Sequence, residues 1–180
     1  MKISKLCSAL TYLTLLFITI LCAATLSAQE AAKPGEVRVE YDRQNDLTKI
    51  TLNPIVLASR KQEELQLGAF ASYKGQQAGA PKEVTLLFIS LSASGVNKYE
   101  SAHKVTVWAD EQRFPLGEAG WSKQAQGTVS IELLAAIVPY DTFSRIAHAK
   151  EVHIRLGETE IRLATNHITA LRAAEGYMKP

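Results

Sequence analysis

Cysteine is nearly absent from this chain, and its two cysteines, Cys7 and Cys22, both lie within the first 28 residues. This segment has the pattern of a secretory signal peptide. Lys2 and Lys5 precede an uncharged apolar run, and Ala28 is a small residue at a suitable cleavage position. Cleavage after Ala28 leaves 152 residues and no cysteine. We therefore expect a mature chain that folds without disulfides and has neither thiol chemistry nor cysteine-ligated metals.

The location predicted from this segment is the periplasm or the outside of a bacterial cell. The alternative is an uncleaved membrane anchor, because the uncharged stretch from Leu6 to Gln29 is long enough to supply the about 20 residues that a spanning helix needs. Its four threonines and short leucine-rich centre favour cleavage, after which no stable membrane insertion is expected. The chain also lacks an Asn-x-Ser/Thr glycosylation site, which agrees with a bacterial source.

An excess of positive charge is lacking as well. Without Lys2 and Lys5, the 20 basic residues fall to 18, which equals the 18 acidic residues. No run of Lys or Arg is longer than Arg60-Lys61. A neutral domain without a basic patch does not have the electrostatic character of a nucleic-acid binder, so nucleic acid is excluded as a partner.

Motifs for catalysis, cofactors and metals are missing too. No serine lies in a glycine-flanked elbow, and the glycine-rich stretch 74–82 lacks the spacing of a phosphate-binding loop. The acid pairs Glu63-Glu64 and Asp110-Glu111 are expected to be solvated at turns. The histidines lack the spacing of a zinc site, and His103 and His167 are expected at the surface. We therefore predict no cofactor and no metal. The four histidines are His103, His148, His153 and His167.

Alternating apolar and polar residues are what the chain has instead, and this pattern begins at Glu36. It predicts antiparallel strands, since successive side chains of a strand point to opposite faces. The strand 83–94 is apolar on both faces, so we expect it at the centre of the sheet with both faces buried. Residues 117–127 are interpreted as a polar loop. The predicted strands and hairpins are 36–52, 65–75, 83–94, 104–116, 128–139 and 152–163.

The stretch 151–163 contains six ionisable side chains, which raises the question of a catalytic cluster. A tight turn with Gly157 and Glu158 at its centre places Arg155 opposite Glu160 and Ile154 opposite Ile161. The apolar residues then share one face, and the charged residues point into water on the other. We interpret the cluster as the solvated face of a β-hairpin.

Two further hairpins are predicted from their turn residues. A turn at Asn45-Asp46 places Asp42 opposite Lys49. A turn at Glu111-Gln112 places Asp110 opposite Arg113. Pro115 cannot donate a backbone hydrogen bond, which indicates an edge strand.

Two helices are predicted in the C-terminal part. The first spans 141–149 with Asp141 as its N-cap, and the second begins with Thr165 as its N-cap and ends near Gly176. The predicted fold class is α+β: about eight antiparallel strands, in a curved sheet or a sandwich, with two C-terminal helices. The predicted organisation is a cleaved signal peptide at 1–28, a short tether at 29–35 and a single domain at 36–178.

Two tryptophans are the candidate binding residues. Trp108 shares the polar face of its strand, and Trp121 lies between glycines in the predicted loop. Exposed tryptophans offer large rigid contact surfaces. Together with Arg113 they form the predicted binding site. The competing interpretation is that a helix covers Trp108 and makes it part of a second core.

The favoured function is an exported, non-enzymatic binding or interaction domain for a protein, a glycan or a small apolar ligand. One alternative is a cell-envelope hydrolase that uses dispersed carboxylates. Another is a carrier that holds a lipid between its sheet and its helices.

Overall fold

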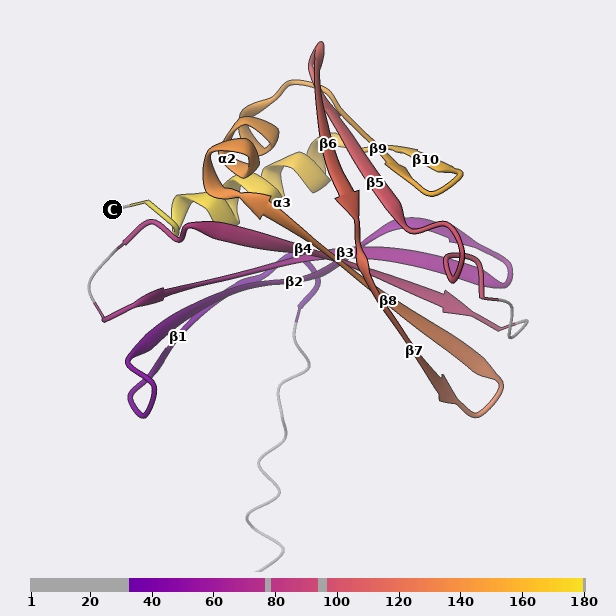
Figure 1. Ribbon diagram of the computed structural model, residues 1–180, viewed down its shortest axis with the longest axis horizontal. Helices are drawn as coiled ribbons and strands as arrows, with labels where there is room; N and C mark the ends of the chain where they lie inside the picture. Colours follow the sequence, from indigo (N-terminus) through magenta and orange to yellow (C-terminus); the bar gives the residue numbers. More distant parts are fainter. Residues whose placement is uncertain (1–32, 77–78, 94–96, 180) are drawn as a thin grey trace, which may run out of the picture. The chain divides into compact units, whose positions relative to one another are not determined.

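The computed structural model describes residues 33–76, 79–93 and 97–179 (Figure 1). Over these residues it has ten strands in two antiparallel sheets and two helices near the C-terminus. The predicted α+β class is therefore confirmed, with ten strands rather than about eight. The predicted signal peptide and all but the last residues of the predicted tether lie outside the described residues.

The larger sheet has six strands in the order β1-β2-β3-β4-β8-β7. Its four inner strands are 10 to 14 residues long, and all neighbouring strands are antiparallel. β4 lies between β3 and β8, so its predicted central position is confirmed. The strands are β1 (Val37–Asp42), β2 (Leu47–Arg60), β3 (Glu63–Lys74), β4 (Glu83–Ser92), β7 (Gly120–Gln126) and β8 (Val129–Pro139).

The smaller sheet has four strands in the order β10-β9-β5-β6. β6 is an edge strand and contains Pro115, as predicted. Its partner β5 is buried at every second position, which turns one face of this sheet toward the core. The strands are β5 (Lys104–Ala109), β6 (Gln112–Glu118), β9 (Val152–Leu156) and β10 (Thr159–Arg162).

Both helices pack against the same face of the larger sheet, which we call the inner face (Figure 1). α2 (Tyr140–His148) follows β8, and α3 (Thr165–Gly176) follows β10. The predicted N-caps are each off by one or two residues, because Pro139 and Ala164 occupy those positions. The predicted end of the second helix at Gly176 is confirmed. Neither helix of the described residues is long and apolar enough to cross a membrane.

The hydrophobic core lies between the inner face, the two helices and the smaller sheet. Each of these elements contributes side chains that are 0–2% exposed, and burial of such side chains is the main force that favours folding. The largest of them are Ile50, Leu52, Leu67, Leu86, Phe88 and Leu134 from the larger sheet, Ile154 and Leu156 from the smaller sheet, Phe143 and Ile146 from α2, and Leu171 and Met178 from α3 and the residues after it.

The hairpin of β9 and β10 has the predicted register. Arg155 pairs with Glu160 and Ile154 with Ile161, and the turn at Gly157 has the positive φ, 57°, that tight turns require. The ionisable side chains of this hairpin are exposed, whereas the alternate residues are buried. The interpretation of this stretch as a solvated hairpin face is confirmed.

The other two hairpins are each shifted by two residues from their predicted registers. The first has a four-residue turn, because Asp42 accepts hydrogen bonds from the backbone N–H groups of Gln44 and Asn45. Lys49 still bonds Asp42 at 2.9 Å, diagonally across the ladder, and this bond holds the pKa of Asp42 well below its usual range. In the second hairpin, Asp110 itself adopts a positive φ and belongs to the turn.

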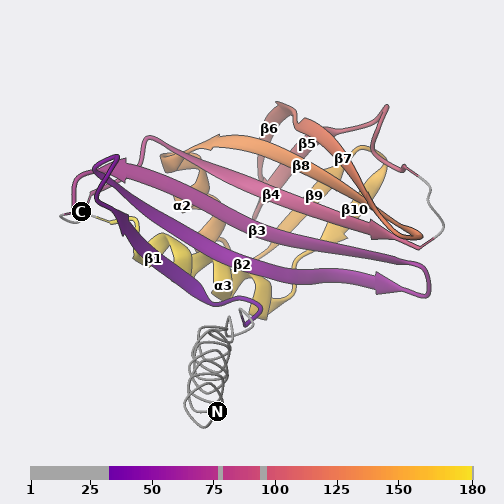
Figure 2. The same cartoon turned by 90° about the horizontal axis from the view of Figure 1, so that it is seen from below.

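The second face of the larger sheet, which we call the outer face, is not covered by any described element (Figure 2). The figure views the molecule from this side, with the strands in front of both helices. On β4 the inner-face residues Val84, Leu86 and Phe88 are at most 1% exposed, whereas the outer-face residues are only partly buried. The prediction that both faces of β4 are buried was therefore wrong for the outer face.

Candidate functional site

Trp108 lies on the solvent-facing side of the smaller sheet. Its neighbours along β5, Val107 and Ala109, point into the core, so Trp108 points away from it and remains half-buried. In the register of the sheet it stands between Arg113 of β6 and His153 of β9. No described helix covers it, because α2 packs on the opposite, core-facing side of β5.

Two guanidinium groups flank the Trp108 ring. The Cζ atoms of Arg113 and Arg155 lie 5.8 and 5.2 Å from the ring centroid, within the range of a cation–π interaction. Arg155 is also held by Glu160, which accepts a hydrogen bond of 2.9 Å from its Nε. Arg113 has no ion pair with any carboxylate of the described residues. Its charge is therefore available to a ligand.

A shallow hollow of about 330 Å³ lies beside this ring and opens to solvent. Its floor includes Ile154, and its rim combines groups of both charges. Asp110 on the rim accepts hydrogen bonds from the backbone N–H groups of Lys150 and Glu151, so its carboxylate fixes the chain between α2 and β9. We call Trp108, Arg113, His153, Arg155 and Glu160 the Trp108 patch.

Trp121 occupies a different environment from Trp108. Most of the predicted loop at 117–127 is the strand β7. Within this strand, Trp121 pairs with Leu134 and packs against the core. Its indole N–H donates a hydrogen bond of 3.0 Å to Glu132. The structure therefore brings Arg113 to Trp108 but does not bring the two tryptophans together.

We expect iodide to quench Trp108 more strongly than Trp121. Arg113 and Arg155 attract the anion to the first ring, whereas Glu132 lies beside the second, which is packed against the core. Each ring can be observed alone in the variants Trp121→Phe and Trp108→Phe. The Stern–Volmer constant for iodide should be several-fold larger in Trp121→Phe than in Trp108→Phe. Equal constants would contradict the expected difference in accessibility between the two rings.

Glu132 is a buried carboxylate, 1% exposed, on the inner face of β8. Besides Trp121, it accepts hydrogen bonds from the backbone N–H groups of Lys98 and Tyr99, at 2.9 and 3.0 Å. Three donors therefore satisfy this group, which anchors the segment before β5 to the larger sheet. These hydrogen bonds give the buried carboxyl group the partners that a buried polar group needs, which accounts for Glu132 as a structural anchor.

A second buried carboxylate, Glu175 of α3, joins the two helices. Tyr140 and Ser144 of α2 donate hydrogen bonds of 3.1 and 3.0 Å to its Oε1. His148 and Lys179 lie 3.2 and 3.1 Å from its Oε2. Sequence reasoning missed this cluster, although Tyr140, Ser144 and His148 recur at the four-residue spacing of one helix face.

Electrostatics explain why Glu175 stays ionised. Burial alone raises its pKa, but the hydrogen bonds from Lys179, His148, Ser144 and Tyr140 outweigh it, and the net pKa is lowered. Burial and the neighbouring carboxylate raise the pKa of Tyr140 to about 12, so its hydroxyl remains a donor at neutral pH.

The Glu175 cluster combines serine, histidine and carboxylate but lacks the geometry of a catalytic triad. In a triad the serine hydroxyl bonds the histidine, whereas here Ser144 and His148 each bond Glu175. Five hollows on the described surface, among them the one beside Trp108, do not include Ser144 or Glu175 in their walls. The cluster is a polar connection between α2 and α3.

The predicted turn acids Glu63 and Glu64 line a hollow of about 260 Å³ at the open end between the two sheets. Glu63 pairs with Lys98 at 3.5 Å, and Glu64 accepts a hydrogen bond from Gln66. Both carboxylates are therefore occupied by neighbouring side chains. Among residues 33–76, 79–93 and 97–179, no group of three His, Cys, Asp or Glu is arranged to hold a metal ion.

His167 is the histidine whose position differs most from its predicted place at the surface. It is only 8% exposed, and its Nδ1 accepts a hydrogen bond of 3.2 Å from the backbone N–H of Ala164. Burial lowers its pKa. It caps the start of α3 and is not available to a ligand.

Comparison with protein-family models, with curated proteins and with solved structures found no match to this chain.

Proposed function

We propose that this protein is an exported, non-enzymatic binding domain that contacts its ligand through the Trp108 patch. The observation that carries the proposal is the half-buried Trp108 ring beside Arg113, a cation that has no carboxylate partner in the described chain. The apolar run at residues 6–29 supports the exported location.

The chemistry of the patch favours an acidic glycan as the ligand. The flat indole of Trp108 suits the C–H face of a sugar ring, and Arg113 offers a planar fork of donors to a carboxylate. His153 and Glu160 supply further polar groups around the hollow. Because the hollow is shallow and open, it suits the side of a long chain better than a small molecule enclosed on all sides.

Isothermal titration with oligogalacturonate tests this proposal, and a neutral galactose oligosaccharide of the same length is the comparison. We expect the acidic oligosaccharide to bind and the neutral one to bind at least tenfold more weakly, a difference of about 1.4 kcal/mol. Trp108→Ala and Arg113→Gln should each weaken binding at least tenfold. Raising the salt concentration should also weaken it, since the contact is partly electrostatic and exposed.

The matched controls are Trp121→Phe and Lys150→Gln. The first changes a tryptophan outside the patch, and the second removes an exposed positive charge near Asp110 that does not contact the Trp108 ring. Both should bind like the unchanged protein. No measurable heat with the acidic oligosaccharide at millimolar concentration, or binding that survives both patch substitutions, would contradict the proposal.

A further inference from the structure

The part of the outer face formed by β4, β7 and β8 is poor in charge. Across β4, β7 and β8, the outward positions carry a single charged residue, Glu83, at the very end of β4. Ile137 is 60% exposed on this face. The remaining outward side chains are apolar or uncharged: Thr85, Leu87, Ile89, Leu91, Gly120, Ser122, Gln124, Gln126, Val129, Ile131, Leu133 and Ala135.

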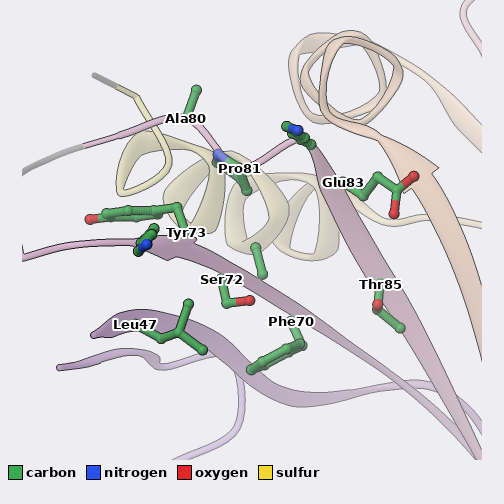
Figure 3. A pocket seen from close by; sticks show the side chains of 11 residues that line it. Leu47, Phe70, Ser72, Tyr73, Ala80, Pro81, Glu83 and Thr85 are labelled. Atoms are coloured by element: carbon green, nitrogen blue, oxygen red, sulfur yellow. The ribbon is translucent and has the colours of Figure 1, made fainter. Parts of the chain in front are cut away.

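The apolar area extends across the neighbouring strands. Phe70 of β3, 39% exposed, and Val56 of β2, 41% exposed, point to the same side. At one end, a hollow of about 450 Å³ is lined by Phe70 together with Leu47 and Pro81 (Figure 3). The figure shows these side chains coming from β2, from β3 and from the loop before β4.

The smaller sheet of the same molecule shows the opposite pattern. Its solvent-facing side carries Arg113, His153, Arg155, Glu160 and Arg162, which alternate with buried residues. An antiparallel sheet with one wet face ordinarily shows this alternation. β4 and β8 lack this alternation. Their outer residues are therefore typical of a sheet face that is shielded from water.

We propose that the outer face packs against the outer face of a second copy of this chain, which forms a symmetric dimer. Two sheets pack face to face about 10 Å apart, and their inward side chains then form a common core. The proposal is independent of the Trp108 patch, which lies on the smaller sheet and stays exposed in such a dimer.

The area of the face fits a stable dimer. The four neighbouring strands β3, β4, β8 and β7, spaced about 4.8 Å apart and about nine residues long, cover roughly 19 Å by 30 Å, or about 570 Å² on each copy. Two copies then bury about 1,100 Å², which exceeds the about 1,000 Å² that a specific interface needs.

The charge distribution also fits self-association. In a symmetric dimer, residues near the two-fold axis meet their own copies, so a charge there would repel an identical charge. The centre of the outer face, around the cross-strand pair Ile89 and Leu133, has no charge. The other charged outward residues lie on β1, β2 and β3, away from this centre, and they are Arg38, Glu40, Asp42, Lys49, Glu64 and Lys74.

Sedimentation equilibrium of the chain expressed from its full sequence tests this inference. The protein is taken from the soluble envelope fraction, and its N-terminus is determined by intact mass. We expect the mass of a dimer at about 20 µM. Leu133→Lys at the centre, and Ile137→Lys at the most exposed apolar position, should each weaken the dimer at least 100-fold.

His153→Lys is the matched control, because it introduces the same side chain on the solvent-facing side of the smaller sheet, and the dimer should persist in it. Ile137→Lys distinguishes loss of the dimer from loss of folding, because a site that is 60% exposed tolerates lysine. The urea midpoint of this variant as a monomer should show that it is folded. A protein that is monomeric at about 200 µM contradicts the inference. So does a dimer that survives both outer-face substitutions. Flotation of the monomer with phosphatidylethanolamine–phosphatidylglycerol vesicles would assign the face to a lipid surface instead and would also overturn it.

Discussion

Replacing Gly157 by alanine is expected to lower the free energy of unfolding by about 4 kcal/mol, the largest effect that we expect for such a replacement among the glycines of the described residues. Two costs add at this position. The backbone of Gly157 has a φ of 57°, which an alanine adopts with strain. A Cβ atom there would also lie 2.1 Å from the carbonyl oxygen of Ala102, and backbone cannot move aside cheaply.

The position of Gly157 explains why both costs arise. It forms the turn between β9 and β10, and its N–H donates a hydrogen bond of 2.9 Å to the carbonyl of Lys104. The segment before β5 therefore crosses directly over the turn. The methyl group would separate the hairpin from this segment, and the core beneath the hairpin would lose its cover.

Two other glycines serve as matched controls, measured by urea denaturation. Gly127 has a φ of 62° but open space around it, so Gly127→Ala should cost only the backbone strain, about 1 kcal/mol. Gly176 has open space and no positive φ, and Gly176→Ala should be neutral or slightly stabilising. If Gly157→Ala and Gly127→Ala cost the same, the close approach of Ala102 would be wrong.

Replacing Glu175 by glutamine is expected to cost about 3 kcal/mol at neutral pH. The carboxylate accepts hydrogen bonds from Tyr140 and Ser144 and pairs with His148 and Lys179. An amide has one oxygen and a donating NH₂ group, so the donors on one side of the group, Tyr140 and Ser144 or Lys179, lose their acceptor. The connection between α2 and α3 should weaken while the strands remain intact.

This substitution should also change the dependence of stability on pH. The folded-state pKa of Glu175 is lowered from its ordinary value of 4.5, so the folded protein holds its ionised form more tightly than the unfolded chain does. The resulting stabilisation is fully present above about pH 4.5 and is lost as the pH falls through the lowered folded-state pKa. The difference in urea midpoint between the unchanged protein and Glu175→Gln should therefore shrink below about pH 4.5.

Glu158→Gln is the control for this experiment. It removes the same charge at an exposed turn position, and its effect should stay within about 0.5 kcal/mol at all pH values. A difference between the unchanged protein and Glu175→Gln that grows toward acid pH would mean that Glu175 is protonated in the folded state at neutral pH.

The hairpins show which local features could be predicted from the residues. The hairpin at 151–163 has the predicted register because Gly157 opens a two-residue turn and both strands alternate cleanly. The other registers were off by two. In one case Asp42 caps a longer turn through its own side chain, and in the other Asp110 is held by Lys150 and Glu151, about 40 residues away. Because both shifts are even, the predicted faces still hold.

The candidate site was only partly predictable for the same reason. Trp108 stood out because it is a large ring on a polar strand face, but Arg155 joins it only through the pairing of β5 with β9. Trp121 could not be separated from Trp108 by sequence, because its burial depends on Glu132 and on the pairing of β7 with β8. β7 itself was missed because its polar residues lie along a sheet edge and do not alternate with apolar ones.

Alternation along single strands, two amphipathic helices and the lack of cysteine in the predicted mature chain were sufficient to determine an α+β chain with antiparallel strands and a solvated hairpin at 151–163. These features depend on residues that are close together in the sequence, so their periodicity can be read from the sequence directly. Only the tertiary structure decided which strands pair across long separations, and therefore which ring meets which cation. It also decided that the inner face of β4 and β8 is buried and that their outer face is exposed. Burial of a face depends on which other elements pack against it, and the residues of an apolar strand do not determine these elements.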